Sequence, residues 1–143
     1  MASPNEKVLG RAFAAWNARD IAALGELIDP EFEFAPHITG GFEGIEFQGI
    51  DGVERFIRMT DEAWESMHVD ASEVHYNGDL IAVLGHLRAR GRSSGIEVEE
   101  EVVWLCQVRH GRALRIEARS ATDHAAVARA LTDAGLPPDL FGV

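Results

Sequence analysis

The start of the chain repeats apolar residues with the period of an α-helix. Apolar side chains recur every three or four positions over 8–16 and again over 21–28, which places one apolar stripe on each helix. A capping box that begins at Ser3 predicts the start of the first helix, and Asp20 can cap the second. Pro30 ends the second helix, because the residue before a proline avoids helical geometry.

A strand and a third helix are predicted next. Residues 31–35 alternate polar and apolar side chains, which is the pattern of a half-buried strand. A glycine-rich loop covers 36–44. Asp51 can then cap a third helix, whose apolar positions run from 53 to 64.

The second half of the chain changes to the two-residue period of β-strands. Strands are predicted over 69–76, 80–90, 96–109 and 113–120, with turns at 77–79, 93–95 and 110–111. The first of these turns, Asn77-Gly78-Asp79, is a strong hairpin signal. A last helix, capped by Thr122 or Asp123, ends at Gly135.

These elements predict a single α+β domain that spans 1–143. Helices gathered on one side of an antiparallel sheet give a two-layer architecture, and strands as long as 96–109 usually bend. A strongly curved sheet wrapped around the three N-terminal helices makes a cone-shaped barrel, to which the last helix adds a short C-terminal element. We expect an apolar pocket between the concave face and the N-terminal helices.

The faces of two strands decide which polar side chains could reach that pocket. The even-numbered residues of 80–90 share one face, and they include His86 and Arg88. On 96–109 the even-numbered residues include Glu100. If the turn pairs Arg88 with Glu100, the three polar groups lie together on one face of the sheet. A register shift of one residue would turn the 80–90 set to the other face.

Composition and charge restrict the possible partners. The chain has 143 residues, 46% of them apolar, and a formal net charge of −11, which argues against nucleic acid or an anionic membrane as partner. It shows no apolar signal core and no run long enough to cross a bilayer, so we expect a cytoplasmic protein. The one cysteine, Cys106, cannot form an internal disulfide and has the neighbours of a buried structural thiol. No histidines have metal-ligand spacing, and we expect neither a metal nor a cofactor.

Three segments carry a likeness to a known family. They are Trp16-Asn17-Ala18-Arg19-Asp20, Leu27-Ile28-Asp29-Pro30-Glu31-Phe32 and Phe47-Gln48-Gly49-Ile50-Asp51-Gly52-Val53. In this order and spacing they resemble the SnoaL-like branch of the nuclear transport factor 2-like superfamily. The resemblance implies a cone-shaped α+β barrel with an apolar cavity, and a homodimer joined through the outer sheet face. It also implies a range of activities, among them polyketide cyclisation, ketosteroid isomerisation, epoxide hydrolysis and non-catalytic binding, and the fold does not choose among them.

The catalytic groups of the known enzymes are missing where the resemblance would place them. Ala12, Ala35 and Trp104 stand where a ketosteroid isomerase would carry a tyrosine and two acidic residues. Ala118 stands where an epoxide hydrolase of this fold would carry an aspartate. A different catalytic set in the same pocket stays open.

Two sets of candidate site residues follow. The resemblance places the shared face of His86, Arg88 and Glu100 inside the cone. The catalytic candidates are these three residues and His37, which lies in the loop after the first strand. Histidine exchanges protons near neutral pH, arginine could hold an enolate or carboxylate oxygen, and glutamate could orient either one. The ligand-binding candidates are Trp16, Phe34, Phe56, Trp104 and Ala118.

Several interpretations of these residues are compatible with the sequence. The protein could be a cofactor-free isomerase, cyclase or hydrolase that acts on a small hydrophobic molecule. It could instead be a non-catalytic small-molecule binder, with Arg88 and Glu100 as a structural ion pair, His86 as a core residue and His37 in a solvated loop. A third possibility is a dimeric scaffold whose pocket is filled by side chains.

Apolar side chains expected on the outer sheet face favour a dimer. Alternation places Val103, Leu105 and Leu87 there, where they would face water in a monomer. The expected partners are therefore a second copy of the chain and a small hydrophobic molecule.

Overall fold

A computed structural model describes residues 4–36 and 46–142 of the chain. In chain order the elements are helix α1 (Pro4–Ala18), helix α2 (Ile21–Leu27), strand β1 (Ile28–Ala35), strand β2 (Phe47–Gln48), helix α3 (Gly49–Ala63), strand β3 (Trp64–Asn77), strand β4 (Leu80–Gly91), strand β5 (Glu97–Arg109), strand β6 (Arg112–Ser120) and helix α4 (His124–Asp133). The expected cap at Ser3, and His37 with most of its loop, lie outside the described residues.

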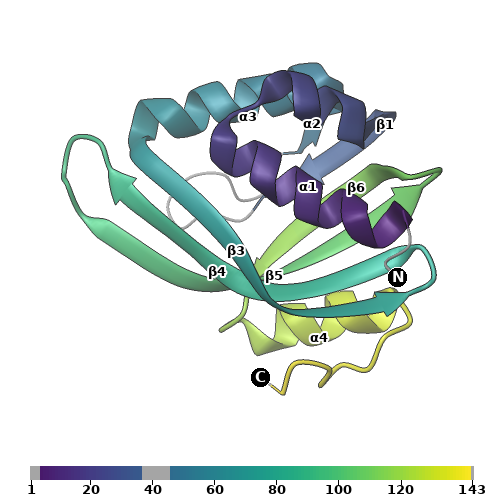
Figure 1. The fold of residues 1–143 in the computed structure, drawn as a ribbon. Coiled ribbons are helices and arrows are strands. Elements are labelled where there is room, and N and C mark those ends of the chain that lie inside the picture. The colour runs from purple at the N-terminus through teal and green to yellow at the C-terminus, as the bar shows by residue number, and fades with distance from the viewer. Residues whose placement is uncertain (1–3, 37–45, 143) are drawn as a thin grey trace.

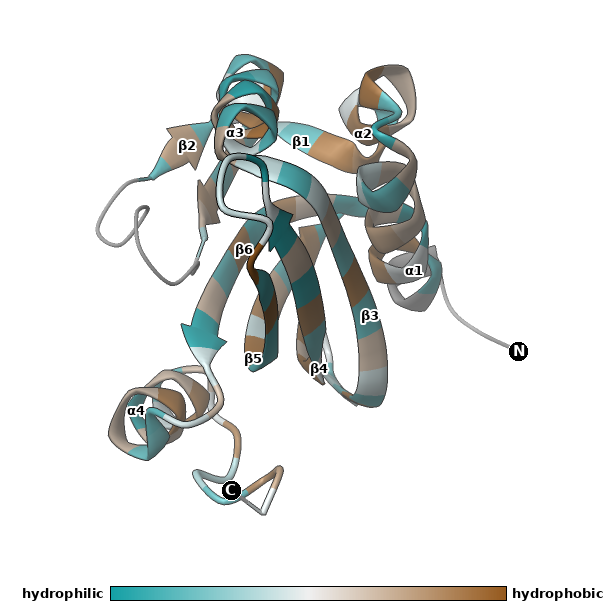
Figure 2. Cartoon of the chain, turned by 90° about the vertical axis from the view of Figure 1, so that its left-hand side faces the viewer, coloured by the Kyte–Doolittle hydropathy of each residue, from teal (hydrophilic) through white to brown (hydrophobic). Residues whose placement is uncertain are grey.

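The helices cover the two faces of the sheet unequally. Helices α1, α2 and α3 lie together over the concave face, whereas α4 lies alone under the outer face (Figure 1). Figure 2 shows α4 set apart from the other three helices, and hydrophilic and hydrophobic residues alternating along the long strands. This alternation gives two apolar clusters, a large one inside the cone and a smaller one beneath α4.

The sheet has six strands in the order β2-β1-β6-β5-β4-β3. Neighbouring strands are antiparallel except β1 and β6, which run parallel. The expected α+β cone is therefore confirmed, with a mixed sheet that does not close into a barrel because β2 and β3 form its edges. Parallel pairing is possible here because β1 and β6 are joined by a long crossover rather than by a tight turn.

Two of the three expected aspartate caps are formed. Asp20 accepts a hydrogen bond from the amide of Ala23 at 3.1 Å, and Asp123 caps α4 in the same way. The expected cap at Asp51 is wrong, because α3 already begins at Gly49 and Asp51 lies within its first turn. The two residues that precede the helix pair with β1 as the short strand β2.

The register of β4 against β5 differs from the expected one by a single residue. Arg88 pairs with Glu99 rather than with Glu100. The hydrogen bond that closes the turn leaves an even-numbered loop, 92–95, whereas the expected pairing needs an odd number of loop residues. The shift turns His86 and Arg88 to the outer face of the sheet, as alternation requires.

Helix α4 covers part of the surface that was expected to hold a second copy. Val103 and Leu105 point to the outer face, as expected, and pack with Val127 and Leu131 of α4. The expected outward position of Leu87 is wrong, because this side chain lines the inside of the cone. These apolar residues therefore do not by themselves require a partner chain.

Candidate ligand-binding cavity

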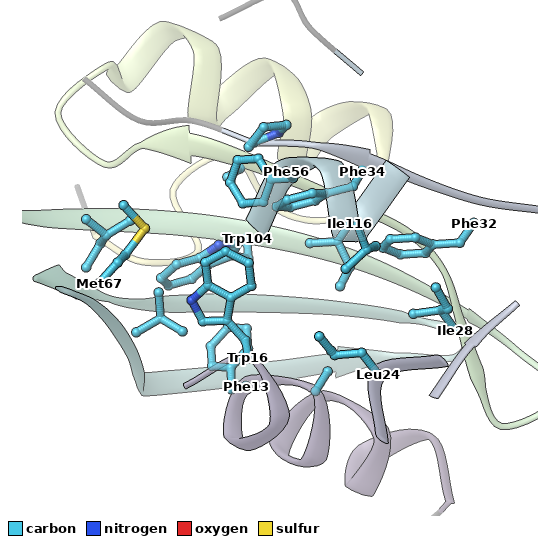
Figure 3. A pocket seen from close by; sticks show the side chains of 16 residues that line it. Phe13, Trp16, Leu24, Ile28, Phe32, Phe34, Phe56, Met67, Trp104 and Ile116 are labelled. Carbon is cyan, nitrogen blue, oxygen red and sulfur yellow. The ribbon is translucent and has the colours of Figure 1, made fainter. Parts of the chain in front are cut away.

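A cavity of about 90 Å³ lies between the first three helices and the concave face of the sheet. Figure 3 shows its lining, which α1, α2, α3 and all the long strands contribute. The lining side chains are alanine, valine, leucine, isoleucine, proline, methionine, phenylalanine and tryptophan. The cavity is therefore apolar on every described side, and it is not fully enclosed.

Aromatic rings occupy much of the space inside the cone. The ring of Trp16 stacks on Phe56 with centroids 5.2 Å apart, and Phe34 meets Phe56 edge-to-face at 4.9 Å. On the other side Phe13 meets Trp104 edge-to-face at 5.0 Å. An apolar cavity of about 150 Å³ can hold a benzene molecule. Because this cavity is smaller, even a one-ring ligand must extend through the opening or displace some of these side chains.

The segment Trp-Asn-Ala-Arg-Asp fixes one wall of the cavity. The Asn17 side chain donates to the carbonyl of Val69 at 2.8 Å and accepts from its amide at 3.0 Å, which ties α1 to the edge strand β3. Arg19 has a φ of +54°, and its guanidinium lies 4.4 Å from the Trp16 ring centroid. Arg19 also pairs with Asp61 of α3 at 3.3 Å. These contacts fix the part of α1 that carries Trp16 against α3 and the sheet.

Gly85 on β4 makes room for the opposite wall. A Cβ atom at this position would lie 2.9 Å from Cζ3 of Trp104 and would overlap the carbonyl oxygen of Asp70. The backbone of β3 is irregular at this point, with a register shift between Ala71 and Glu73. Only glycine lets the indole and the bulged strand approach each other so closely. The sequence contains the glycine, but no local pattern indicates that Trp104 and β3 approach it so closely.

The sequence-predicted ligand-binding residues all lie at the cavity. The side chains of Trp16, Phe34, Phe56, Trp104 and Ala118 belong to its lining. Ala12, which stands where a ketosteroid isomerase would carry its tyrosine, lines the cavity too. Of the replaced positions, Ala12, Trp104 and Ala118 therefore line the cavity and carry no acid–base group there, whereas Ala35 is not part of the lining.

The sequence-predicted catalytic residues are not brought together. His86 and Arg88 lie on the outer face, so their expected place inside the cone is wrong. His86 Nδ1 lies 3.6 Å from Asp70 Oδ1, and Arg88 Nε lies 3.9 Å from Glu99 Oε1. Exposed pairs of this kind contribute little to stability. The register shift explains the error, since it reverses β4 while leaving β5 as expected.

Glu100 does lie on the concave side of the sheet. It pairs with Leu87, which lines the cavity, and directly opposed residues share a face. Glu100 is nevertheless not part of the lining. His37 falls outside the described residues, although it follows Pro36, a lining residue, in the sequence.

Cys106 is a buried structural thiol, as expected. Its side chain belongs to the inner apolar cluster, and burial raises its pKa from 9.0 to about 12. A thiol with such a pKa stays protonated near neutral pH and is a poor nucleophile.

An ion pair outside the cavity anchors the beginning of β1. Asp29 accepts a hydrogen bond from the amide of Glu31 at 2.8 Å and binds Arg109 at 3.0 Å. The amide of Glu31 and the Arg109 guanidinium together lower the pKa of Asp29. The strand begins at Ile28, ahead of Pro30, although the sequence placed Ile28 in the preceding helix. Its neighbour Asp29 thus helps to hold Ile28 in the cavity wall.

Within 4–36 and 46–142, no three side chains of histidine, cysteine, aspartate or glutamate are grouped as metal ligands would be. Over the same residues, no helix has the length and apolar character needed to span a membrane.

Several proteins of solved structure share this fold. An NTF2-like protein of unknown function from Burkholderia pseudomallei K96243 is 22% identical, with 87% of this chain and 95% of that chain covered and a TM-score of 0.76. TerC, co-crystallised with polyporic acid, is 22% identical over 87% of this chain and 96% of its own, with a TM-score of 0.74. A protein proposed to be a SnoaL-like polyketide cyclase, from Jannaschia sp. CCS1, is 19% identical over 87% and 90%, with a TM-score of 0.70.

The sequence comparisons point to the same family. No curated protein matches the chain significantly. The family model of the SnoaL-like domain matches residues 9–116, a span that runs from α1 into β6 and includes most of the cavity lining. The chain therefore belongs to the SnoaL-like family and has an NTF2-like fold.

Proposed function

We propose that the protein binds a small, uncharged, largely apolar molecule in the cavity inside the cone. One observation carries this proposal: no described side chain of the lining can ionise. Small-molecule sites are typically concave and mostly apolar, with few polar groups that set the orientation. A charged ligand would lose its hydration here without gaining a counter-ion from the lining.

The similar structures agree with a role in binding small molecules. TerC was co-crystallised with polyporic acid, and a Catenulispora acidiphila protein of ketosteroid isomerase-like fold was solved in complex with trimethylamine. These ligands belong to those proteins. For this chain they support only the idea that a protein of this fold can bind a small molecule.

A thermal-shift screen with a cavity-filling variant tests the proposal. A ligand that binds the native state alone raises the melting temperature in a dose-dependent way, and we expect this for flat, apolar compounds of one or two rings. Ala118→Leu adds bulk to the lining and should abolish the shift, whereas Ala125→Leu, on an exposed position of α4, should preserve it. No shift with any such compound would contradict the proposal and favour a scaffold whose pocket is filled by side chains.

Acid–base catalysis is the second candidate function. It is favoured by the position of Glu100 on the concave face, opposite a lining residue. We propose Glu100 and His37 as the residues that would act on a bound molecule in a cofactor-free isomerase, cyclase or hydrolase. Turnover of a ligand found in the screen, lost in Glu100→Gln or His37→Ala with binding retained, would support this. Equal turnover in both variants would contradict it.

Assembly of two copies through the outer face is a separate proposal. This proposal rests on the family likeness alone. Helix α4 already covers Val103 and Leu105, so these apolar residues no longer argue for a partner chain. Sedimentation velocity at micromolar concentration should show a dimer. A monomer would remove the proposal without affecting the cavity.

A further inference from the structure

We propose that the indole N–H of Trp16 is the hydrogen-bond donor that orients the ligand, so that the ligand carries an uncharged acceptor such as a ketone or ether oxygen. This inference rests on the proposed binding function and specifies the chemistry of its ligand. It follows from one buried polar atom in a lining that is otherwise almost free of them.

Trp16 Nε1 is buried, and no described residue accepts its hydrogen. Buried tryptophan nitrogens usually find an acceptor, and a buried polar group left without one costs about 1–3 kcal/mol. An unpaired buried donor in a native protein therefore calls for an explanation. Trp16 is itself part of the lining, and an acceptor atom on a cavity ligand would supply the missing partner.

Among residues 4–36 and 46–142, no protein group takes this role. On β3, the backbone amide and carbonyl of the lining residue Val69 are already bound to Asn17. The stacked neighbour Phe56 presents a ring without an acceptor oxygen. The lining includes only one other nitrogen-bearing side chain, Trp104, and an indole nitrogen also donates rather than accepts.

The charge near the indole favours the same ligand chemistry. The Arg19 guanidinium lies against the Trp16 ring at 4.4 Å from its centroid, and a cation there draws electron density from the ring and strengthens its N–H as a donor. Arg19 itself is paired with Asp61 and with the Trp16 carbonyl. A neutral acceptor is therefore satisfied by the indole, whereas a carboxylate would lack a free cation in the lining.

Two probes that differ at one atom test the inference. Acetophenone carries a carbonyl oxygen where α-methylstyrene carries a CH₂ group of similar shape. Their dissociation constants are measured for the wild type, Trp16→Phe and Trp104→Phe. We expect Trp16→Phe to weaken acetophenone about 5–10-fold more than it weakens α-methylstyrene, which is the strength of one hydrogen bond. Trp104→Phe, the same change of ring at another lining position, should weaken both probes equally.

The outcomes separate the inference from the function on which it rests. If both probes bind but Trp16→Phe affects them equally, the donor role of Trp16 is overturned while cavity binding stands. If the selective loss occurs in Trp104→Phe instead, the donor is the other indole and the inference for Trp16 is again wrong. If neither probe binds the wild type, the binding function fails, and the donor role with it.

Nuclear magnetic resonance tests the same inference on the wild-type protein, so the result does not depend on the folding of a variant. The chain has three tryptophans, so its ¹H–¹⁵N spectrum has three indole signals that can be followed in the wild type. Acetophenone should move the Trp16 signal downfield in the proton dimension, and α-methylstyrene should not. If acetophenone moves no indole signal downfield, or moves that of another tryptophan, the assignment of the donor to Trp16 is contradicted.

Discussion

The two faces of the sheet are built from the same strands, but where β4 passes the cavity their chemistry differs. On the concave face, Leu87, Trp104 and Ala118 meet the helices and line the cavity. On the outer face, the next residues along β4 are His86 and Arg88, which pair with carboxylates. The difference arises from alternation alone, so a single residue in one turn decides which set is inside. Polar residues that look like a catalytic group in the sequence are thus surface residues in the fold.

The largest expected effect separates the stability of the outer face from the function of the concave face. Leu131 of α4 is fully buried against the outer face. Leu131→Ala should lower the free energy of unfolding by about 2–5 kcal/mol, because it leaves a cavity beneath α4. Denaturant unfolding measures this loss. The affinity of the folded variant for a cavity ligand should stay unchanged, and a large change would mean that the two faces are coupled.

A smaller loss of stability is expected where the concave face is most tightly packed. Gly85→Ala would push a methyl group against Trp104 and the Asp70 carbonyl. We expect a loss of about 1–3 kcal/mol, as for other overpacked positions, together with altered tryptophan fluorescence. As a matched control, Gly10→Ala adds the same methyl group to α1, where nothing lies within 4 Å. That variant should gain about 0.5–1 kcal/mol, and equal behaviour of the two would contradict the packing described for Gly85.

The burial of Cys106 on the concave face predicts how the free energy of unfolding changes at alkaline pH. The folded protein holds the pKa of Cys106 at about 12, against 9.0 for an ordinary thiol. The thiol in the unfolded chain therefore ionises first, and its contribution to stability is complete below pH 9 and is lost as the pH rises toward 12. Between pH 8 and pH 10 the wild type should lose about 1.4 kcal/mol more than Cys106→Val. Parallel pH profiles in urea unfolding would show that the thiol is not buried as described.

The smallest effects are expected on the polar part of the outer face. His86→Ala and Arg88→Ala should change the free energy of unfolding by no more than about 0.5 kcal/mol, as is usual at exposed positions. Neither should alter ligand affinity, because both side chains point away from the cavity. A clear loss of affinity in calorimetric titration of either variant would place that residue inside the cone after all.

Much of this architecture could be predicted from the sequence, because periodicity records which side chains are buried. The helical stripes that contain Trp16 and Phe56, and the strand that contains Trp104, were placed correctly. The sequence does not predict which face of β4 is buried. Alternation fixes which residues share a face, but it does not say which of the two faces points into the cone. The loop length that decides this differs by one residue between the two registers, and both registers satisfy the local turn signals.

Other features of the site depend on contacts between distant residues and leave no local pattern. The pairing of Asn17 with the backbone of Val69 joins residues 52 positions apart. An asparagine after a helical stripe suggests a helix end rather than a partner for a strand. The close approach at Gly85 and the unpaired nitrogen of Trp16 likewise become visible only when the strands and helices are assembled.

We propose that a small apolar molecule binds the concave face of the sheet and not the outer one. A methyl ¹H–¹³C spectrum recorded during titration with acetophenone tests it most directly. The methyl signals of Leu87, Ile116 and Ala118, which line the cavity, should move together and saturate. Those of Val103 and Leu105, packed beneath α4, should stay in place. Saturable shifts confined to the second group, or none in the first, would contradict the account.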